Sequence, residues 1–403
     1  MNILFMTIGR MANIEDHTIY CDLLREFRNN GHSVYTISPF EKRTGKKTEY
    51  KEICGVYMLH VKSGNVTRSV GLIEKGISQV LLEKCFIAGI KKYLSDVKFD
   101  LVMYSTPPIT FYKAINYVKK RDGAKTYLLL KDIFPQNAVD LGIMTKTGLK
   151  APLYKFFRNK EKNIYGISDY IGCMSQANVN YVLKHNPGVN SKIIEVCPNS
   201  VEPIDMSVDE QTRVVIRERY GIPVDKKVFI YGGNLGKPQG IDFLIKCIES
   251  QKNNEKAYFL VIGEGTEYAK LEEFENNTRQ KNFKLMKRLP KEDYDAMVGA
   301  CDVGMVFLDH RFTIPNFPSR LLAYMQAKIP VLAVTDSNTD IGKVIIDGGF
   351  GWWCESNDID GFDRAIDSCV TSESDMGIVA WNYLNQYYSS SIGYKTIIHH
   401  FAK

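Results

Sequence analysis

The chain has 403 residues, of which 44% are hydrophobic and 24% charged, and its formal net charge is +6. This length suits about two domains, and the composition is that of a globular protein. No apolar run reaches the ~20 residues that span a bilayer; nine scattered cysteines without a C-x-x-C pair indicate a reduced, cytoplasmic protein, and the mild positive charge fits an acidic ligand or a membrane surface without requiring nucleic acid.

Strand and helix patterns alternate along the first half of the chain. Residues 2–7 predict a buried first strand rather than a signal peptide, a glycine turn follows at Gly9, and residues 17–30 predict a helix. Further strands are predicted at residues 33–38, 57–61, 101–104, 126–130, 170–174 and 192–197. This rhythm is typical of a doubly wound parallel sheet. The turn sequence PNSVEP that follows indicates a linker between domains.

A second round of the same pattern begins after the linker. Strands are predicted at residues 227–231, 257–262, 283–286, 303–307 and 330–334, with a helix at 241–250. The sequence therefore predicts domains at 1–202 and 203–380, with ligands at the carboxyl ends of the strands. The aromatic stretch that follows, which includes Trp381, Tyr383, Tyr387 and Tyr388, predicts a final helical segment at 381–403.

The segment from Ile314 to Val334 is the most informative of the chain. It predicts a loop, a short helix and a buried strand, with Ser319 as the N-cap whose hydroxyl accepts a backbone N–H. Arg320 adds a positive charge to the first turn, where free N–H groups and the helix dipole favour an anion. These features predict a phosphate-binding end; an ordinary helix–strand unit of an α/β domain is the alternative.

The sequence YGGNLGKPQG, residues 231–240, forms a second candidate phosphate site. It comes after a predicted strand and before a predicted helix, so glycines such as Gly233 let the backbone approach a pyrophosphate closely. Lys237 can place an ammonium group against the same ligand. A glycine turn that serves the backbone alone is the alternative.

These two segments resemble the donor-binding motifs of the retaining glycosyltransferases of family 4, which have a GT-B fold of two Rossmann-like domains across a cleft. The matching residues of the helix segment are Ser319, Arg320, Leu321, Leu322, Tyr324 and the strand start Pro330-Val331. Two glutamates usual in the family are replaced by Pro315 and Ala323. The resemblance implies that sugar and ribose contacts come from elsewhere, such as Asn316 or Gln326.

Further positions fit the same family pattern. Asn234 stands where the family usually has an arginine and Gln239 where it has a lysine, which leaves Lys237 and Arg320 as the leading cations. Gly263 matches the family's glycine turn below the nucleotide. The pair Arg288-Leu289 matches the residues that flank the base. The resemblance also implies that Gly9 lies at the donor, and that the last helix returns to the first domain.

The segment LLLKDIFPQNAVDLG, residues 128–142, resembles a motif of capsule and O-antigen glycosyltransferases of this family. It places Lys131 and Asp132 at the end of a buried strand. Asp132 is a candidate to bind an acceptor hydroxyl or to orient the sugar, and Lys131 and His17 are candidates for acceptor binding. A helix N-cap, or a buried aspartate satisfied by the backbone, is the alternative for Asp132.

Three other features bear on partners. Residues 70–94 combine apolar residues with Lys75, Lys84, Lys91 and Lys92, so they predict either a helix in a membrane interface or one packed on its own sheet. Asp358-Ile359-Asp360 has the form of a metal-binding motif, but N-capping is the better interpretation. His399-His400 is interpreted as surface rather than ligand.

The resemblance implies a retaining, metal-independent transfer of a hexosyl or N-acetylhexosaminyl group, without a cofactor. The donor would be a nucleotide sugar, most simply a UDP-sugar, and the acceptor a polyprenyl-diphosphate-linked glycan at the inner face of the cell membrane. The diphosphate would be stabilised by Lys237 and Arg320, and its own phosphate would deprotonate the acceptor. The sequence does not identify the sugar, the nucleotide, the acceptor, the linkage or the oligomeric state.

Three rival functions stay open. A sugar-nucleotide epimerase of the same fold would need cleft carboxylates and histidines, of which the motifs contain few. An NAD-dependent oxidoreductase would need G-x-G-x-x-G, whereas the first turn, TIGRMAN, has a single glycine. A non-catalytic scaffold is consistent with the two missing glutamates.

Overall fold

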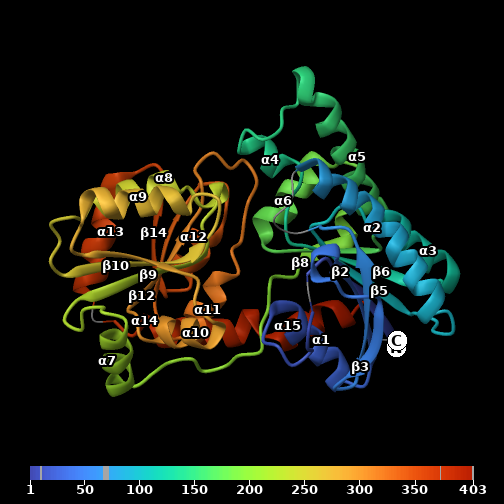
Figure 1. Ribbon diagram of the computed structural model, residues 1–403, viewed down its shortest axis with the longest axis horizontal. Coiled ribbons are helices and arrows are strands. Elements are labelled where there is room, and N and C mark those ends of the chain that lie inside the picture. The colour runs from blue at the N-terminus through green and yellow to red at the C-terminus, as the bar shows by residue number, and fades with distance from the viewer. Residues whose placement is uncertain (10, 67–71, 373, 402–403) are drawn as a thin grey trace. The chain divides into compact units, whose positions relative to one another are not determined.

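The computed structural model describes residues 1–9, 11–66, 72–372 and 374–401. The chain forms two compact units, each built on a parallel sheet (Figure 1). The first unit contains Met1–Glu202 together with Ser390–Lys403, and the second contains Pro203–Ser389. Two Rossmann-like α/β domains with a terminal helix that returns to the first one are therefore confirmed.

The first unit is built on an eight-stranded sheet with helices on both faces. Its strands are β1 (Asn2–Met6), β2 (Ser33–Glu41), β3 (Glu49–Ile53), β4 (Val56–Ser63), β5 (Leu101–Thr106), β6 (Lys125–Leu130), β7 (Tyr170–Cys173) and β8 (Ile194–Val196). Its α-helices are α1 (Ile19–Asn29), α2 (Leu72–Tyr93), α3 (Tyr112–Asp122), α4 (Gln136–Asp140), α5 (Ala151–Ile167), α6 (Gln176–His185) and α15 (Ser390–Ile398).

The strand order of the first unit is β3-β4-β2-β1-β5-β6-β7-β8, and every pair except β3–β4 is parallel. The order reverses direction between β1 and β5, which is the switch point where doubly wound folds bind ligands. Helix α15 packs on α1: the rings of Tyr394 and Phe27 are 4.9 Å apart, and Ser390 Oγ donates a hydrogen bond to Glu26 Oε1 (2.9 Å). Ile397 is fully buried in the core of this unit.

The second unit is built on a six-stranded, all-parallel sheet. Its strands are β9 (Lys227–Asn234), β10 (Ala257–Glu264), β11 (Phe283–Lys287), β12 (Val303–Phe307), β13 (Val331–Thr335) and β14 (Gly351–Glu355). Its α-helices are α7 (Glu210–Arg219), α8 (Ile241–Ser250), α9 (Tyr268–Thr278), α10 (Lys291–Gly299), α11 (Arg320–Gln326), α12 (Ile341–Asp347), α13 (Ile359–Thr371) and α14 (Met376–Tyr383).

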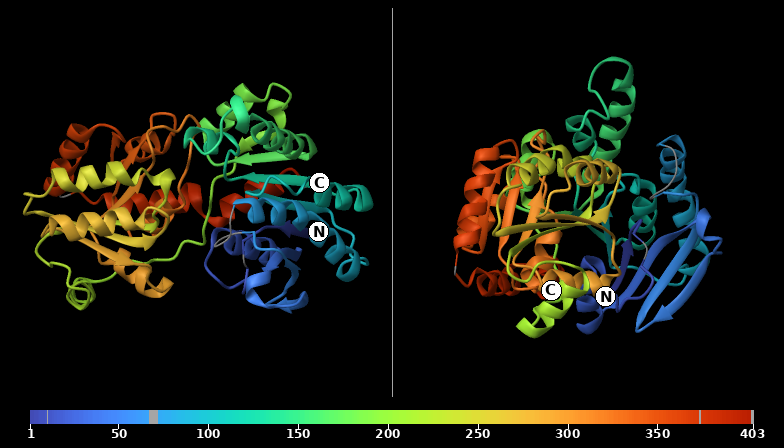
Figure 2. Two further views of the ribbon diagram at one scale, coloured as in Figure 1. Left: turned by 45° about the horizontal axis from the view of Figure 1, so that its top comes forward. Right: turned by 60° about the vertical axis from the view of Figure 1, so that its left-hand side comes forward.

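The strand order of the second unit is β11-β10-β9-β12-β13-β14, the order of a dinucleotide-binding Rossmann fold. Figure 2 shows the helices of this unit on both faces of the sheet. Its central strands β9, β10, β12 and β13 are mostly buried, which explains why they appear in the sequence as short continuous apolar runs. The switch point lies between β9 and β12, so the loops after these two strands are the expected ligand site.

Two strands escaped prediction. The side chains of β3 are mostly exposed, and this strand pairs antiparallel with β4 through the turn at Cys54-Gly55, so it carries little apolar signal. Strand β14 is short and begins directly after a glycine turn. Both lie at an edge of their sheet, where the hydrophobic pattern is weakest.

The predicted boundary at residue 381 is wrong. Residues 381–389 belong to the second unit, and the return to the first unit begins at Ser390. The aromatic residues of this stretch pack on the second unit: the ring centroids of Tyr383 and Phe350 are 5.0 Å apart, and those of Tyr388 and Phe317 are 6.0 Å apart. The aromatic pattern therefore reports packing within the second unit.

Residues 70–94 were predicted to contact either a membrane or the sheet. Residues 70 and 71 lie outside the described residues, as do the side chains of 72–77, 79 and 80. In the part that is described, Leu82, Phe86 and Ile90 are fully buried, and Gly89 lets α2 approach Val61 of β4. The second half of α2 therefore packs on the sheet. No described helix combines the length and the apolar character needed to cross a membrane.

Candidate functional site

The loop after β9 lies at the switch point of the second unit and depends on two glycines. A β-carbon on Gly232 would overlap the ring and hydroxyl of Tyr294, a residue of α10. Gly233 has a φ of +118°, a conformation that side chains rarely allow. The glycine pair is therefore required by close packing beneath the loop and by the backbone itself.

A second glycine turn lies beside the first. Strand β10 pairs in parallel with β9, and Gly263 stands opposite Gly233 in the ladder. A β-carbon on Gly263 would overlap the carbonyl of Gly233, and one on Gly265 would overlap the carbonyl of Leu235. The two turns can thus lie against each other only because these positions lack side chains, and they leave Gly233 and Asn234 exposed.

Arg320 lies directly against this glycine loop. Its guanidinium carbon is 4.2 Å from the ring centroid of Tyr231, and its Nη2 is 3.6 Å from the place that a β-carbon on Gly233 would occupy. Its Nη1 is buried and has no hydrogen-bond partner among the described residues. An arginine is always charged in proteins, and a buried donor without a partner is costly, so this arrangement is suited to an anion held at the loop.

Helix α11 begins differently from the prediction. Ser319 already has helical backbone angles (φ −67°, ψ −12°), and its side chain makes no capping hydrogen bond. Instead the first turn is tight: Leu321 N donates to Pro318 O (3.4 Å) and Leu322 N donates to Ser319 O (3.1 Å). Ser319 thus stands at the predicted N-cap position, but the predicted acceptance of a backbone N–H by its hydroxyl is wrong, because these backbone bonds already satisfy the donors that a cap would serve.

The other positions predicted on α11 differ in exposure. Ser319 is exposed and Ala323, four residues later, is partly exposed. Leu321 is fully buried, so its side chain belongs to the core. Only the backbone of Leu321 could therefore contact a ligand.

Asn316 lies in the loop between β12 and α11. Its side-chain Nδ2 is buried and has no partner among the described residues. Its carbonyl accepts a hydrogen bond from Thr339 Oγ1, and Asn338 Nδ2 donates to Phe312 O (2.6 Å), so the loop is fixed by the segment after β13. Asn316 and Arg320 thus provide two buried donor atoms, four residues apart, that no described residue binds.

The residues at the two missing cation positions bind one another. Gln239 Oε1 accepts hydrogen bonds from Asn234 Nδ2 (3.0 Å) and from Gly236 N (3.1 Å), which closes the glycine loop. Lys237 begins the 3₁₀ turn of this loop; its side chain is exposed and forms no ion pair with the residues that the structure describes. Lys237 therefore remains available as a cation, whereas Gln239 serves the loop itself.

Arg288 and Leu289 follow β11, next to the end of β10. Arg288 Nη1 lies 3.2 Å from Glu264 Oε1, and both side chains are exposed. Sequence reasoning missed Glu264 and two tyrosines near Arg320, the fully buried Tyr231 and the partly exposed Tyr294. The signal that could have found Tyr294 is the pair Gly232-Gly233, because a turn needs only one glycine for a positive φ, and a second glycine indicates that a neighbour lies close to the backbone.

In the first unit, Asp132 follows β6 and is held from two sides. Thr106 Oγ1 donates to the Asp132 carbonyl (3.2 Å), and Asn137 Nδ2 lies within 2.9 Å of both carboxylate oxygens. Burial raises the pKa of Asp132 to about 6, against the opposing effect of the Asn137 hydrogen bond. The N-cap of α4 is Pro135, so Asp132 is not a cap, and its carboxylate is satisfied by a side chain.

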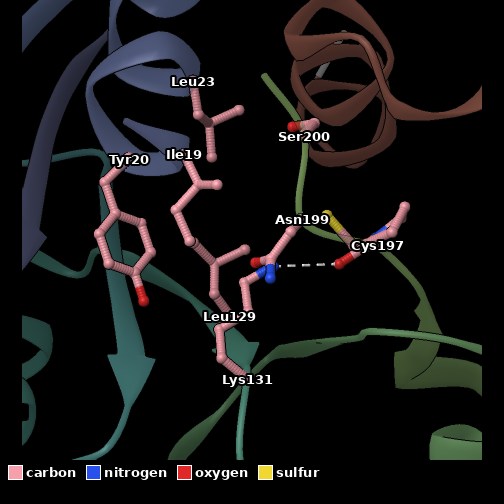
Figure 3. Close-up of a pocket in the computed structure, with 9 residues that line it drawn as sticks. Ile19, Tyr20, Leu23, Leu129, Lys131, Cys197, Asn199 and Ser200 are labelled. Atoms are coloured by element: carbon pink, nitrogen blue, oxygen red, sulfur yellow. Dashed lines mark hydrogen bonds between the residues drawn. The ribbon is translucent and has the colours of Figure 1, made fainter. Parts of the chain in front are cut away.

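Lys131 points into the first unit. Its ammonium donates to the Cys197 carbonyl (3.4 Å) in a pocket that α1, β6 and the loop after β8 enclose (Figure 3). Burial lowers the pKa of this lysine. The pocket has a volume of about 10 Å³, enough for about one water molecule. A sugar does not fit there, so the structure gives no support to acceptor binding by the Lys131 side chain.

Gly9 and His17 lie near the switch point of the first unit. Gly9 N donates to Thr7 Oγ1 (3.0 Å), which forms a tight turn after β1. The exposed His17 lies beside Arg25, whose guanidinium donates to Asp22 (2.6 Å) and to Glu202 (2.7 Å). These contacts hold α1 and the end of the first unit together.

Two groups of described side chains have the composition of metal sites, and both are in the first unit. One is His17, Asp22 and Glu202, where the Arg25 cation already occupies the position between the carboxylates. The other contains Glu195 and His400, whose ring stacks on Tyr170 at 3.8 Å. His400 is therefore part of the packing and not a surface residue.

The predicted N-cap at Asp358 is confirmed. Its Oδ1 accepts a hydrogen bond from Gly361 N (2.9 Å) at the start of α13.

Comparison with known proteins gives consistent matches. Residues 213–378 match the family model of the glycosyl transferases group 1. A probable glycosyltransferase, WbjE, of Pseudomonas aeruginosa is 27% identical over 80% of this chain and 78% of its own. The putative colanic acid biosynthesis glycosyl transferase WcaI of Escherichia coli K12 is 22% identical over 61% and 60%.

A solved structure shares the fold. Anabaena Alr3699/HepE in complex with UDP has a TM-score of 0.67 at 12% identity, over 100% of this chain and 99% of that one. The fold is thus GT-B, and the second unit is similar to the glycosyl transferases group 1. The matched residues 213–378 contain the glycine loop, Asn316 and Arg320.

Proposed function

We propose that this chain is a retaining glycosyltransferase of family 4 that transfers a sugar from a UDP-sugar to a polyprenyl-diphosphate-linked glycan in surface-polysaccharide synthesis. It acts without a metal, on the cytoplasmic face of the cell membrane. The sugar is a hexose or an N-acetylhexosamine. Support comes from the matched family, from relatives named for polysaccharide synthesis and from a UDP complex of the same fold.

One observation carries the proposal: the guanidinium of Arg320, whose buried Nη1 has no partner among the described residues. It lies against Gly233, in a loop whose backbone is open to an approaching ligand. A diphosphate at this place would accept the missing hydrogen bond and balance the charge. Lys237 begins the next turn of the same loop and supplies a second cation from the exposed side.

The site lowers the barrier through charge stabilisation. As the bond from the sugar to the diphosphate breaks, negative charge grows on the leaving phosphate, where Arg320 and Lys237 can stabilise it. Asn316 Nδ2, also buried and unpartnered, is suited to a hydroxyl of the sugar or ribose. Arg288 and Leu289 flank the base, and the exposed Ser319 hydroxyl is free for the phosphate.

Asp132 is the candidate group for the acceptor. Its pKa of about 6 leaves it mostly ionised at neutral pH, so it can accept a hydrogen bond from an acceptor hydroxyl while Asn137 holds it in place. The proton of that hydroxyl passes to the phosphate of the departing nucleotide, because the new bond forms on the face that the nucleotide leaves.

A direct test uses the purified chain with UDP, GDP and NAD. Under the proposal UDP raises the melting temperature and the other two do so less, and EDTA does not abolish UDP binding in calorimetry. Transfer is then measured with a panel of UDP-sugars. UDP binding without transfer to any lipid-linked acceptor would favour a scaffold, and interconversion of free UDP-sugars would favour an epimerase.

A further inference from the structure

The segment between α4 and the middle of α5, residues 142–160, stands away from the sheet of the first unit (Figures 1 and 2). It carries four large apolar side chains that are at least two-fifths exposed: Ile143, Leu149, Leu153 and Phe156. Leu149 is fully exposed. We call residues 142–160 the apolar–basic tip. Single exposed apolar residues are ordinary on a protein surface, but four on one short projection indicate a contact surface.

The tip is a defined structure. Gly142 and Gly148 have left-handed φ angles of 71° and 70° and form the turns at the two ends of its loop, residues 142–148. Between them, Met144 is buried, and its N–H donates to Ala138 O (3.0 Å). On α5, Ile164 and Tyr165 are buried in the unit, whereas Leu153 and Phe156, three residues apart, look outward. The apolar side chains are thus exposed on a surface that is already formed.

The charge of the tip is of one sign. There is no Asp or Glu between Asp140 and Glu161, and the cations in this interval are Lys146, Lys150, Lys155, Arg158 and Lys160. Arg158 is bound to Glu161 (2.5 Å) at the base of the tip. The four lysines form no salt bridge with the residues that the structure describes. Instead, Lys146 lies over the ring of Tyr154 (5.9 Å) and Lys160 over that of Phe156 (5.5 Å).

We propose that the apolar–basic tip docks the first unit on a bilayer surface that contains anionic phospholipid. Apolar side chains ringed by lysines have the composition of interfacial membrane segments: the apolar groups enter the acyl boundary, and the lysine stems extend toward the headgroup phosphates. A second copy of this chain is a poor occupant, because the lysines of the two tips would repel each other. A nucleic acid would use the lysines but leave Leu149 in water.

The proposal deepens the proposed function and rests on it, since an acceptor with a polyprenyl anchor would be reached from the same surface. It also places the membrane contact at residues 142–160 instead of at residues 70–94, where the sequence offered a candidate helix. In α2, residues 82, 86 and 90 are buried against the sheet, whereas the tip comprises the loop after α4 and the first half of α5, and its four large apolar side chains are exposed.

The test is flotation of the full chain with phosphatidylcholine vesicles, with and without phosphatidylglycerol. Wild-type protein binds the anionic vesicles, and added salt weakens that binding. Leu149→Ser with Phe156→Ser weakens it by about tenfold or more for each side chain. Lys146→Gln with Lys150→Gln weakens it by about fivefold for each lysine. Leu81→Ser, an exposed apolar position on α2, and Lys252→Gln with Lys281→Gln in the second unit are the matched controls and bind as wild type.

Several results would overturn the proposal. These are equal binding to both kinds of vesicle, wild-type binding by the tip variants, and loss of binding in Leu81→Ser, which would move the contact to α2. A dimer that the tip variants dissociate, measured by light scattering, would assign the tip to a second copy. UDP affinity is measured on the same proteins: vesicle binding without UDP binding defeats the proposed function alone, and the reverse result defeats the docking surface alone.

Discussion

The two units treat their buried polar groups differently at the carboxyl ends of their strands. In the second unit, Arg320 and Asn316 keep buried donors that have no partner among the described residues. In the first unit, Asp132 is bound by Asn137 and Lys131 by a carbonyl, and the buried atoms near them that have no partner among the described residues, Asn137 Oδ1 and Asn199 Oδ1, are acceptors rather than donors. A buried donor without a partner costs folding free energy, so two of them at one place indicate a site that is already arranged to bind an anion. Groups that already have partners must rearrange, or share those partners, before they can bind a ligand. The donor end is therefore the part whose chemistry is already in position.

The largest expected effect comes from Arg320→Ala. Removing one donor to a developing charge typically slows turnover by ~10²–10³, and this guanidinium has no substitute at its place. UDP affinity and kcat/KM with the best UDP-sugar are the measurements. Arg320→Lys keeps the charge but not the fork of donors, so it should fall between the two. Near-normal turnover in the alanine variant, with unchanged folding, would show that the backbone alone holds the phosphate.

Asp132→Asn tests the paired groups of the first unit, and the quantity measured is the free energy of unfolding. The pKa of Asp132 is raised to about 6 by burial, so the folded state binds this proton more tightly than the unfolded chain does. The group's contribution to stability is therefore present below about pH 4 and is lost as the pH rises to about 6. The loss is at most about 3 kcal/mol.

Asp132→Asn should remove that part of the pH dependence, which denaturant unfolding at several pH values measures. Since the pKa is that of the free protein, activity that depends on the carboxylate should rise with pH through about 6, and this rise should be absent in the variant. An unchanged pH dependence of stability would mean that Asp132 is not buried as described.

Lys237→Ala should have a smaller effect than Arg320→Ala, about tenfold in kcat/KM, because an exposed ammonium is hydrated and screened. The matched control is Lys246→Ala, an exposed lysine on α8 that follows the same loop. Equal effects of Lys237→Ala and Arg320→Ala would remove the distinction between the buried and the exposed cation. No effect would leave Arg320 as the main cation.

Ala323→Glu is expected to give the smallest change. Ala323 stands where the family usually has a glutamate, four residues after the exposed Ser319 and therefore about one turn along α11. A carboxylate there should hydrogen-bond the ribose and tighten UDP binding several-fold in calorimetry, with Ala323→Gln gaining less. Weaker binding would show that the ribose is held differently and that the family comparison fails at this helix.

The sequence was sufficient for the elements whose signal is local. The boundaries of α8 and β12 were predicted to the residue, because a buried helix face and a short apolar run define them. The edge strand β3 was missed because its side chains face water. Residues 381–389 were assigned to the wrong domain, because aromatic residues indicate that a segment is buried but do not indicate in which domain.

The candidate site was only partly predictable, because sequence spacing places residues along the chain but does not fix which way their side chains point. Glycines at 233 and 263 and the cation at 320 could be placed from motif spacing. The missing partner of Arg320, the bond between Asn234 and Gln239, and the inward course of Lys131 all depend on side-chain directions that spacing does not fix. Ser319 holds the predicted N-cap position but makes no capping hydrogen bond, because the first turn of α11 is tighter than the pattern indicates.

Because α15 belongs to the first unit, the two units can complete their folding only in a certain order while the chain is synthesised. The second unit is one continuous stretch and is complete once Ser389 has emerged. The first unit, although translated earlier, lacks Ile397 in its core and Tyr394 against Phe27 until the final residues leave the exit tunnel. We therefore expect the first half of the nascent chain to expose the apolar surface along α1 until α15 has been synthesised. Truncation before Ser390 should expose that surface and make the chain a substrate for chaperones, while the second unit still folds.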